Sequence, residues 1–118
     1  MIRQFEIWNR KFNTLEGHLY FDTETEKFSM TIEKEFTGKV DIMFDILNKQ
    51  KVYNVPQHIV DNWVQSRVIP PDRQGLKGIL EDAGMKEYHV PTLFFYCMGD
   101  CDMDYTYCKE ITNDADNN

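Results

Sequence analysis

Segment 97–108 holds the side chains of this sequence that are best suited to bind a metal ion. Cys97, Cys101 and Cys108, with His89 before them, offer the sulfur and nitrogen ligands that zinc takes. Their spacing contains no Cys-x-x-Cys pair, so free cysteines are the favoured interpretation and zinc coordination is the alternative. The odd number of cysteines, 3, also argues against a disulfide framework.

The aspartates of the same segment suggest a second metal. Asp100, Asp102 and Asp104 alternate as at the start of a calcium-binding loop. The pattern then fails, because Tyr105 stands where the loop needs a glycine and Ile111 where it needs a bidentate carboxylate. A solvated turn that leads into a strand is the favoured interpretation.

No recognisable catalytic group emerges from the rest of the chain. The three histidines are scattered singly, so none is placed to activate a cysteine nucleophile. No glycine-rich phosphate loop is present, and plentiful carboxylates do not by themselves identify an acid–base pair. The sequence predicts a protein that is not an enzyme and has no cofactor. A metal-dependent enzyme that uses segment 97–108 is the alternative from another class.

The stretch 62–76, "NWVQSRVIPPDRQGL", concentrates a tryptophan, two arginines and a Pro-Pro pair. Trp63 falls on an apolar stripe and is predicted to lie in the core. Arg67 and Arg73 flank the rigid corner, and a half-buried arginine needs carboxylate or carbonyl acceptors. Asp104 is the predicted partner. We expect these residues to pin the corner to a sheet; the alternative is a recognition surface where the arginines meet an external anion.

Two helices joined at such a corner also resemble a DNA-binding helix-turn-helix in outline. Arg73, Gln74 and Lys77 are placed to read bases, but three carboxylates in the same helix oppose a nucleic acid. A structural corner is therefore favoured.

Composition limits the possible partners and compartments. The chain has 118 residues, a hydrophobic fraction of 42% and a net charge of -7. This suits one domain with a modest core, and it makes direct nucleic-acid binding a poor expectation. The acidity also suits an inhibitor that imitates DNA. No apolar run is long enough for a membrane span and no secretion signal is apparent, so we expect a cytoplasmic protein without a membrane partner.

Apolar periodicity predicts the elements that must position these residues. Alternation predicts strands around residues 3–8, 14–22 and 27–36, with Glu16 on the outer face beside His18 and Tyr20. Residues 39–50 fit a helix or a strand, and the helix is favoured.

The second half contains clearer helix signals. Pro56 opens a helix with Asn54 as a possible cap, and Pro70 and Pro71 end it. A second helix runs from Pro71 to a left-handed Gly84, and it is expected to bury four residues, Leu76, Ile79, Leu80 and Ala83. Residues 90–97 are a buried strand or a short helix, and 103–111 are the last strand.

Together these elements predict an α+β fold. An antiparallel sheet of about four strands, from the N-terminal meander plus the C-terminal strand, carries two or three helices on one face. We expect a single domain over residues 1–111, followed by a disordered acidic tail over residues 112–118.

The order of "LYFDTETEKFS", "NWVQSRVIPPDRQGLKGILEDAG" and "YCMGDCDMDY" resembles a small domain of Firmicutes proteins that precedes HipA-like kinase domains. The positions that match the pattern are Asp22, Trp63, Arg67, Ile69, Pro70, Arg73, Leu80, Gly99 and Asp104. The resemblance implies an accessory module without its kinase body, so no catalytic residue carries over to this chain.

Two partners are consistent with this reading. The resemblance implies a regulatory module that binds a HipA-like kinase, as an antitoxin-like subunit does. The alternative is a phage or mobile-element inhibitor of a host defence nuclease, in the manner of an anti-CRISPR protein. Trp63, Arg67, Arg73 and Asp104 are the candidate residues for partner binding or for pinning the fold.

Overall fold

The structure, a computed structural model, describes residues 1–101 and 103–111. Its elements in chain order are β1 (Ile2–Asn9), β2 (Thr14–Asp22), β3 (Lys27–Ile32), α1 (Ile42–Lys49), α2 (Gln57–Ser66), α3 (Leu76–Asp82), α4 (Val90–Cys97) and β4 (Thr106–Glu110). The described residues thus form 4 strands and 4 helices, against the two or three helices that the sequence predicts.

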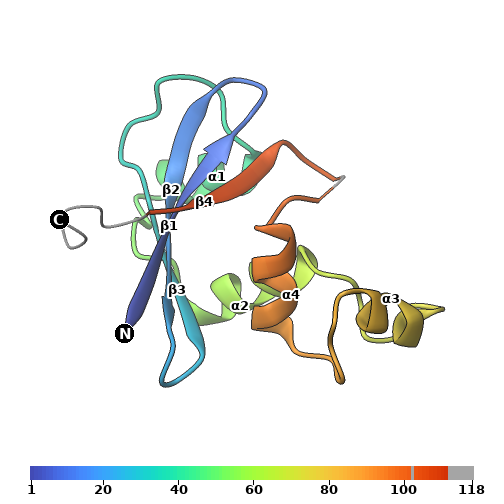
Figure 1. The fold of residues 1–118 in the computed structure, drawn as a ribbon. Coiled ribbons are helices and arrows are strands. Elements are labelled where there is room, and N and C mark those ends of the chain that lie inside the picture. The colour runs from blue at the N-terminus through green and yellow to red at the C-terminus, as the bar shows by residue number, and fades with distance from the viewer. Residues whose placement is uncertain (102, 112–118) are drawn as a thin grey trace, which may run out of the picture.

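The strands form one antiparallel sheet in the order β3-β2-β1-β4 (Figure 1). The first three strands are the predicted meander, with Leu19 of β2 opposite Phe5 of β1 and Met30 of β3. The last strand returns to the outer side of β1, where Cys108 lies opposite Ile7. The α+β fold with an antiparallel sheet is confirmed.

Three helices cover the apolar face of this sheet and form the core with it. Phe44 of α1 and Phe94 of α4 both contact Trp63 of α2, with ring centroids 6.3 and 6.1 Å from the indole. Phe94 also meets Phe28 of β3 edge-on at 5.3 Å. Trp63 is therefore in the core, as predicted, and joins the three helices.

Burial explains why residues 39–50 form a helix rather than a strand. Phe44 and Leu47, one helical turn apart, are buried against the sheet. Ile42 and Ile46, which would extend a strand-like alternation through Phe44, are exposed. The helix places Leu47 in the core beside Phe44 and leaves the two isoleucines outside, which matches the helical spacing and not the alternation.

Residues 90–97 form a helix rather than a buried strand. Its first turn is stabilised by His89, whose side chain accepts a hydrogen bond from the Thr92 backbone N–H, and by Pro91 near the start. Phe95 stacks on Phe5 at 5.6 Å. The helix therefore lies against the sheet and forms one wall of the site described below.

The second predicted helix is shorter and less buried than expected. It begins at Leu76 rather than Pro71, and within it only Leu80 is buried. Figure 1 shows α3 standing away from the sheet, joined to the body by the two loops at its ends. Gly84 has a φ of 75°, as predicted for the residue that ends the helix.

The predicted outer-face position of Glu16 is wrong. The pairing of β1 with β2 shifts between Ile7 and Trp8, so that Ile7 faces Gly17 while Trp8 faces Leu15. This β-bulge leaves Glu16 without a cross-strand partner and turns it inward, where it is 0% exposed.

Two further expectations differ from the structure, and a third concerns residues that the structure does not describe. Asn54 does not cap α2; it pairs with Thr31 in a short β-bridge, and the N-cap position is Pro56 itself. The last strand starts at Thr106 rather than at residue 103. The predicted disordered tail, 112–118, lies outside the described residues.

Candidate functional site

The corner after α2 is held by Arg67, which is 5% exposed. Its guanidinium forms a two-pronged ion pair with Asp104, Nη2 to Oδ1 at 2.5 Å and Nη1 to Oδ2 at 3.0 Å. Nη2 also donates to the Thr106 carbonyl at 3.0 Å, and Nε donates to the Gly99 carbonyl. The predicted pairing of Arg67 with Asp104 is therefore present, although Asp104 lies just before the last strand rather than on it.

The core supports this arginine from behind. Its guanidinium carbon lies 4.7 Å from the centre of the Trp63 ring, a cation–π arrangement. Burial lowers the pKa of Arg67, but the hydrogen bonds and charge of Asp104 outweigh burial, so the pKa is raised above its ordinary value. Arg67 is thus a permanently charged group with its acceptors supplied from within the fold.

A second polar cluster adjoins this network through Thr106. Glu16 Oε1 lies 2.6 Å from the Thr106 hydroxyl oxygen, and Glu16 Oε2 accepts the Asp41 backbone N–H at 2.8 Å. The same hydroxyl contacts the Asp41 carboxylate, which Asn9 also approaches at 3.4 Å. Three segments distant in sequence thus meet at the Thr106 hydroxyl, and Asn9 joins them through Asp41.

The two contacts of the Thr106 hydroxyl restrict the protonation of this cluster. The hydroxyl has one hydrogen and lies between the carboxyl groups of Glu16 and Asp41. One of those carboxyls must therefore carry a proton if both contacts are hydrogen bonds. Burial raises the pKa of both groups, in keeping with a shared proton.

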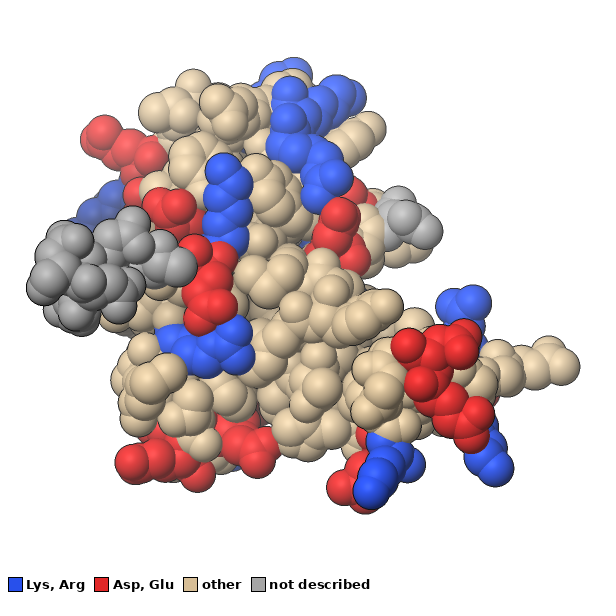
Figure 2. All heavy atoms as spheres, viewed as in Figure 1, with Lys and Arg blue, Asp and Glu red and all other residues tan. Residues whose placement is uncertain are grey.

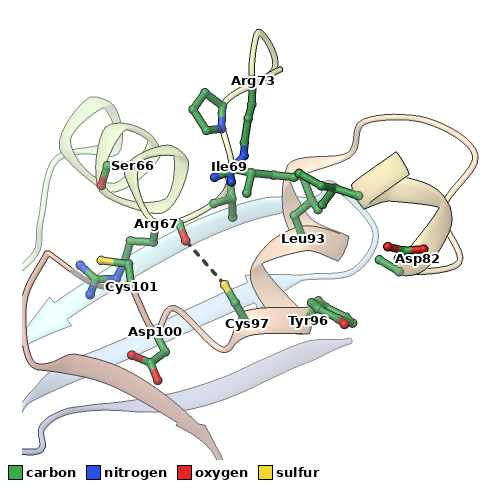
Figure 3. A pocket seen from close by; sticks show the side chains of 14 residues that line it. Ser66, Arg67, Ile69, Arg73, Asp82, Leu93, Tyr96, Cys97, Asp100 and Cys101 are labelled. Carbon is green, nitrogen blue, oxygen red and sulfur yellow. Dashed lines mark hydrogen bonds between the residues drawn. The ribbon is translucent and has the colours of Figure 1, made fainter. Parts of the chain in front are cut away.

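A cavity of about 520 Å³ opens on the other side of the corner. It is enclosed by the loop after α2, one side of α3, and α4 with the turn that follows it (Figure 3). Most of its lining is apolar, including Val68, Ile69, Ile79 and Leu93.

The polar side chains that line this cavity differ in whether they have a partner within the fold. Asp100 is paired with Arg10 at 2.7 Å. The Arg73 side chain makes no hydrogen bond or ion pair with any described residue, and Figure 3 shows it running from its loop back toward Ile69. The predicted network at the corner therefore contains Arg67 but not Arg73.

The three cysteines are free thiols, two at the cavity and one in the core. Cys97 and Cys101 line the cavity, and the Cys97 thiol donates to the Arg67 carbonyl at 3.6 Å. Cys108 of β4 is buried in the core, and burial raises the pKa of its thiol to about 12. Burial also raises the pKa of Cys97, which does not favour a thiolate nucleophile there.

The metal interpretations of this segment find no support in residues 1–101 and 103–111. Within them, no three His, Cys, Asp or Glu side chains are grouped so as to hold a metal ion. Asp100 and Asp104 each face an arginine, and Asp102 lies outside the described residues. Asp100 and Asp104 are therefore each engaged in an ion pair within the fold.

Four positions of the resemblance to HipA-associated domains meet at one place. They are Trp63, Arg67, Gly99 and Asp104, which together make the buried arginine site. Asp22 lies apart, at the β2–β3 hairpin, where its carboxylate accepts the backbone N–H of Glu24 at 2.9 Å.

Searches with this chain against protein-family models, curated proteins and solved structures found no match. Among the described residues, no helix has both the length and the apolar character required to cross a membrane.

Sequence reasoning missed the cluster around Thr106. Asn9, Glu16 and Thr106 are each at most 1% exposed, yet all three stand in segments that read as ordinary amphipathic strands. A glycine directly after Glu16 was the one available signal, because a glycine inside a strand often marks a bulge or a close backbone approach. A Cβ at Gly17 would collide with the Thr31 carbonyl of β3.

Proposed function

We propose that this chain is a non-catalytic regulatory module that binds another protein, and that the partner is a HipA-like kinase. The observation that carries the proposal is a surface around α3 and α4 that exposes a tyrosine and an arginine. Tyr96 is 73% exposed beside the cavity, and Arg73 has no partner among the described residues. Tyrosine and arginine are the side chains that protein interfaces favour.

The shape of this surface also supports a binding role. One cavity lies on each side of α3; the second, of about 510 Å³, is lined by Leu76, Lys77 and Leu80 among others. Figure 2 shows an uncharged area over α4, with carboxylates and basic side chains around it. An apolar centre with a charged rim suits a specific protein contact.

The resemblance supplies the partner class. In the related arrangement the small domain precedes a kinase body, so a chain of this type would contact the kinase from outside. Binding that holds the kinase inactive would make the protein an antitoxin-like subunit.

The test is direct binding to a purified HipA-like kinase, with kinase autophosphorylation as the functional readout. Tyr96→Asp should abolish binding and restore autophosphorylation. Ile42→Asp is the matched control, because Ile42 is 76% exposed on α1, away from this surface. No binding by the wild-type chain, or equal effects of the two variants, would contradict the proposal.

An inhibitor of a host defence nuclease is the second candidate, and the net charge of -7 favours it. On the face in Figure 2, however, acidic and basic side chains alternate rather than forming a continuous acidic strip. Inhibition of a purified nuclease that weakens steeply with salt and competes with DNA would support this candidate over the kinase.

A further inference from the structure

The cavity beside the α2–α3 corner has the dimensions of a small-molecule site. Its volume of about 520 Å³ lies inside the range of roughly 300–1,000 Å³ that such sites occupy. Ile69 of the corner, Ile79 of α3 and Leu93 of α4 give it apolar walls on three sides. An apolar body of several carbons would bury its surface here.

The charge in the cavity is asymmetric. Arg67 lines it, but its three guanidinium nitrogens are already occupied by Asp104 and two carbonyls. Arg73 has no such partner among residues 1–101 and 103–111, and its side chain runs along the apolar wall near Ile69 (Figure 3). An arginine fork without an acceptor beside an apolar wall suits a carboxylate.

The two acids of the lining restrict how such a ligand lies. Asp100 is neutralised by Arg10 at 2.7 Å. Asp82 of α3 has no described partner and lies on the opposite side of the cavity from Arg73 in Figure 3. A ligand's carboxylate would therefore lie at Arg73, and its apolar part would extend toward Leu93 and Ile79.

From these features we propose that the cavity binds a small free carboxylic acid with an apolar body, of the size of a medium-chain fatty acid. A bound acid would contact the corner loop, α3 and α4 together, because all three border the cavity. Because α3 and Tyr96 belong to the surface proposed above for the partner, occupancy would set the shape of that surface. The binding itself does not depend on the proposed function.

Octanoate and its neutral counterpart octanamide are the probes for this site. Titration of the full-length protein, followed by calorimetry and by backbone amide shifts, should show saturable binding of octanoate. We expect octanamide to bind about tenfold more weakly, because it lacks the charge that pairs with Arg73. The shifts should fall on the loop after α2, on α3 and on α4.

Three variants test the assigned contacts. Arg73→Gln should remove the preference for octanoate over octanamide. Asp82→Asn should raise the affinity for octanoate and leave the affinity for octanamide unchanged. Lys77→Gln is the matched control: Lys77 is a basic residue of the same helix that lines the second cavity, so octanoate affinity should not change. Arg73, Asp82 and Lys77 are exposed, so the variants should fold as the wild type does.

The free thiols supply an independent readout. Bound octanoate should slow alkylation of Cys97 and Cys101 by N-ethylmaleimide at alkaline pH, whereas the buried Cys108 should react slowly with or without it. The proposal is overturned if octanoate fails to bind at millimolar concentrations or is not preferred to octanamide. It is equally overturned if Arg73→Gln keeps the preference, or if the shifts map to α1.

Discussion

Two arginines six residues apart show how differently one corner treats the same side chain. Arg67 is 5% exposed, and every guanidinium nitrogen has an acceptor within the fold. Arg73, on the far side of the proline pair, is exposed and has no partner among the described residues. Arg67 is committed to holding the structure, and Arg73 is available for something outside it.

The same contrast separates the surroundings of the two residues. Around Arg67 and Thr106 the buried polar side chains are hydrogen-bonded within the fold, as are all buried side-chain nitrogen and oxygen atoms of the described residues. On the other side, α3 buries a single residue and is bordered by two cavities. Complete satisfaction of polar groups rigidifies one side, whereas incomplete packing leaves the other open to a partner or ligand.

The largest expected effect compares the two arginines directly. Arg67→Met should lower the free energy of unfolding by about 3 kcal/mol, because it leaves Asp104 without its counter-charge and two carbonyls without a donor. Arg73→Met should change it by less than about 0.5 kcal/mol. Urea denaturation of both variants measures the difference, and similar losses would remove the distinction between the two sides of the corner.

A smaller loss is expected at the buried acid. Glu16→Ala should cost about 2 kcal/mol, because the Asp41 N–H loses its acceptor. Glu16→Gln should cost less than Glu16→Ala, because its amide oxygen can still accept from the Asp41 N–H and its amide nitrogen can donate to the Thr106 hydroxyl. Urea denaturation of both variants near pH 7 gives these values.

The glutamine variant also makes a prediction about pH. Because burial raises the pKa of Glu16 in the folded state, its contribution is complete below the unfolded pKa of about 4.3 and is lost as pH rises through the folded pKa. Wild-type stability relative to Glu16→Gln should therefore fall as pH rises above that value. Denaturation curves at several pH values measure it; a difference that stays constant or grows with pH would contradict a raised pKa of Glu16 in the folded protein.

Two glycines, Gly99 beneath Arg67 and Gly78 in α3, extend the comparison to the two sides of the corner. Gly99→Ala should destabilise the protein by about 1.5 kcal/mol, because Gly99 has a φ of 70° and a Cβ there would lie 3.0 Å from the Phe94 ring. Thermal unfolding measures the loss. An unchanged melting temperature would show that the turn beneath Arg67 is less constrained than its geometry indicates.

The smallest effect is expected in α3. Gly78→Ala has open space around the new methyl group, so it should stabilise the helix by about 0.7 kcal/mol. Because α3 packs little against the body, the gain should show as slower amide hydrogen exchange within α3 more than as a higher melting temperature. Slower exchange throughout the sheet would instead indicate that α3 is coupled to the core.

Local patterns determined much of this protein from the sequence alone. Alternating apolar residues predicted the meander, the stripe through Trp63 predicted α2, and Gly84 marked the end of α3. Each of these signals depends on residues within one or two turns of each other. The pairing of Arg67 with Asp104 was also within reach, because a half-buried arginine in an acidic chain must find an acceptor.

Only the tertiary structure decided the rest, because it depends on contacts between distant segments. A one-residue bulge carried Glu16 from the outer face to the interior, and Asp41 and Thr106 came to it from elsewhere in the chain. The two arginines likewise stand only six residues apart in the sequence. Arg67 found its acceptors on the loop and strand after α4, while Arg73 points along a cavity that exists only because α3 stands away from the sheet.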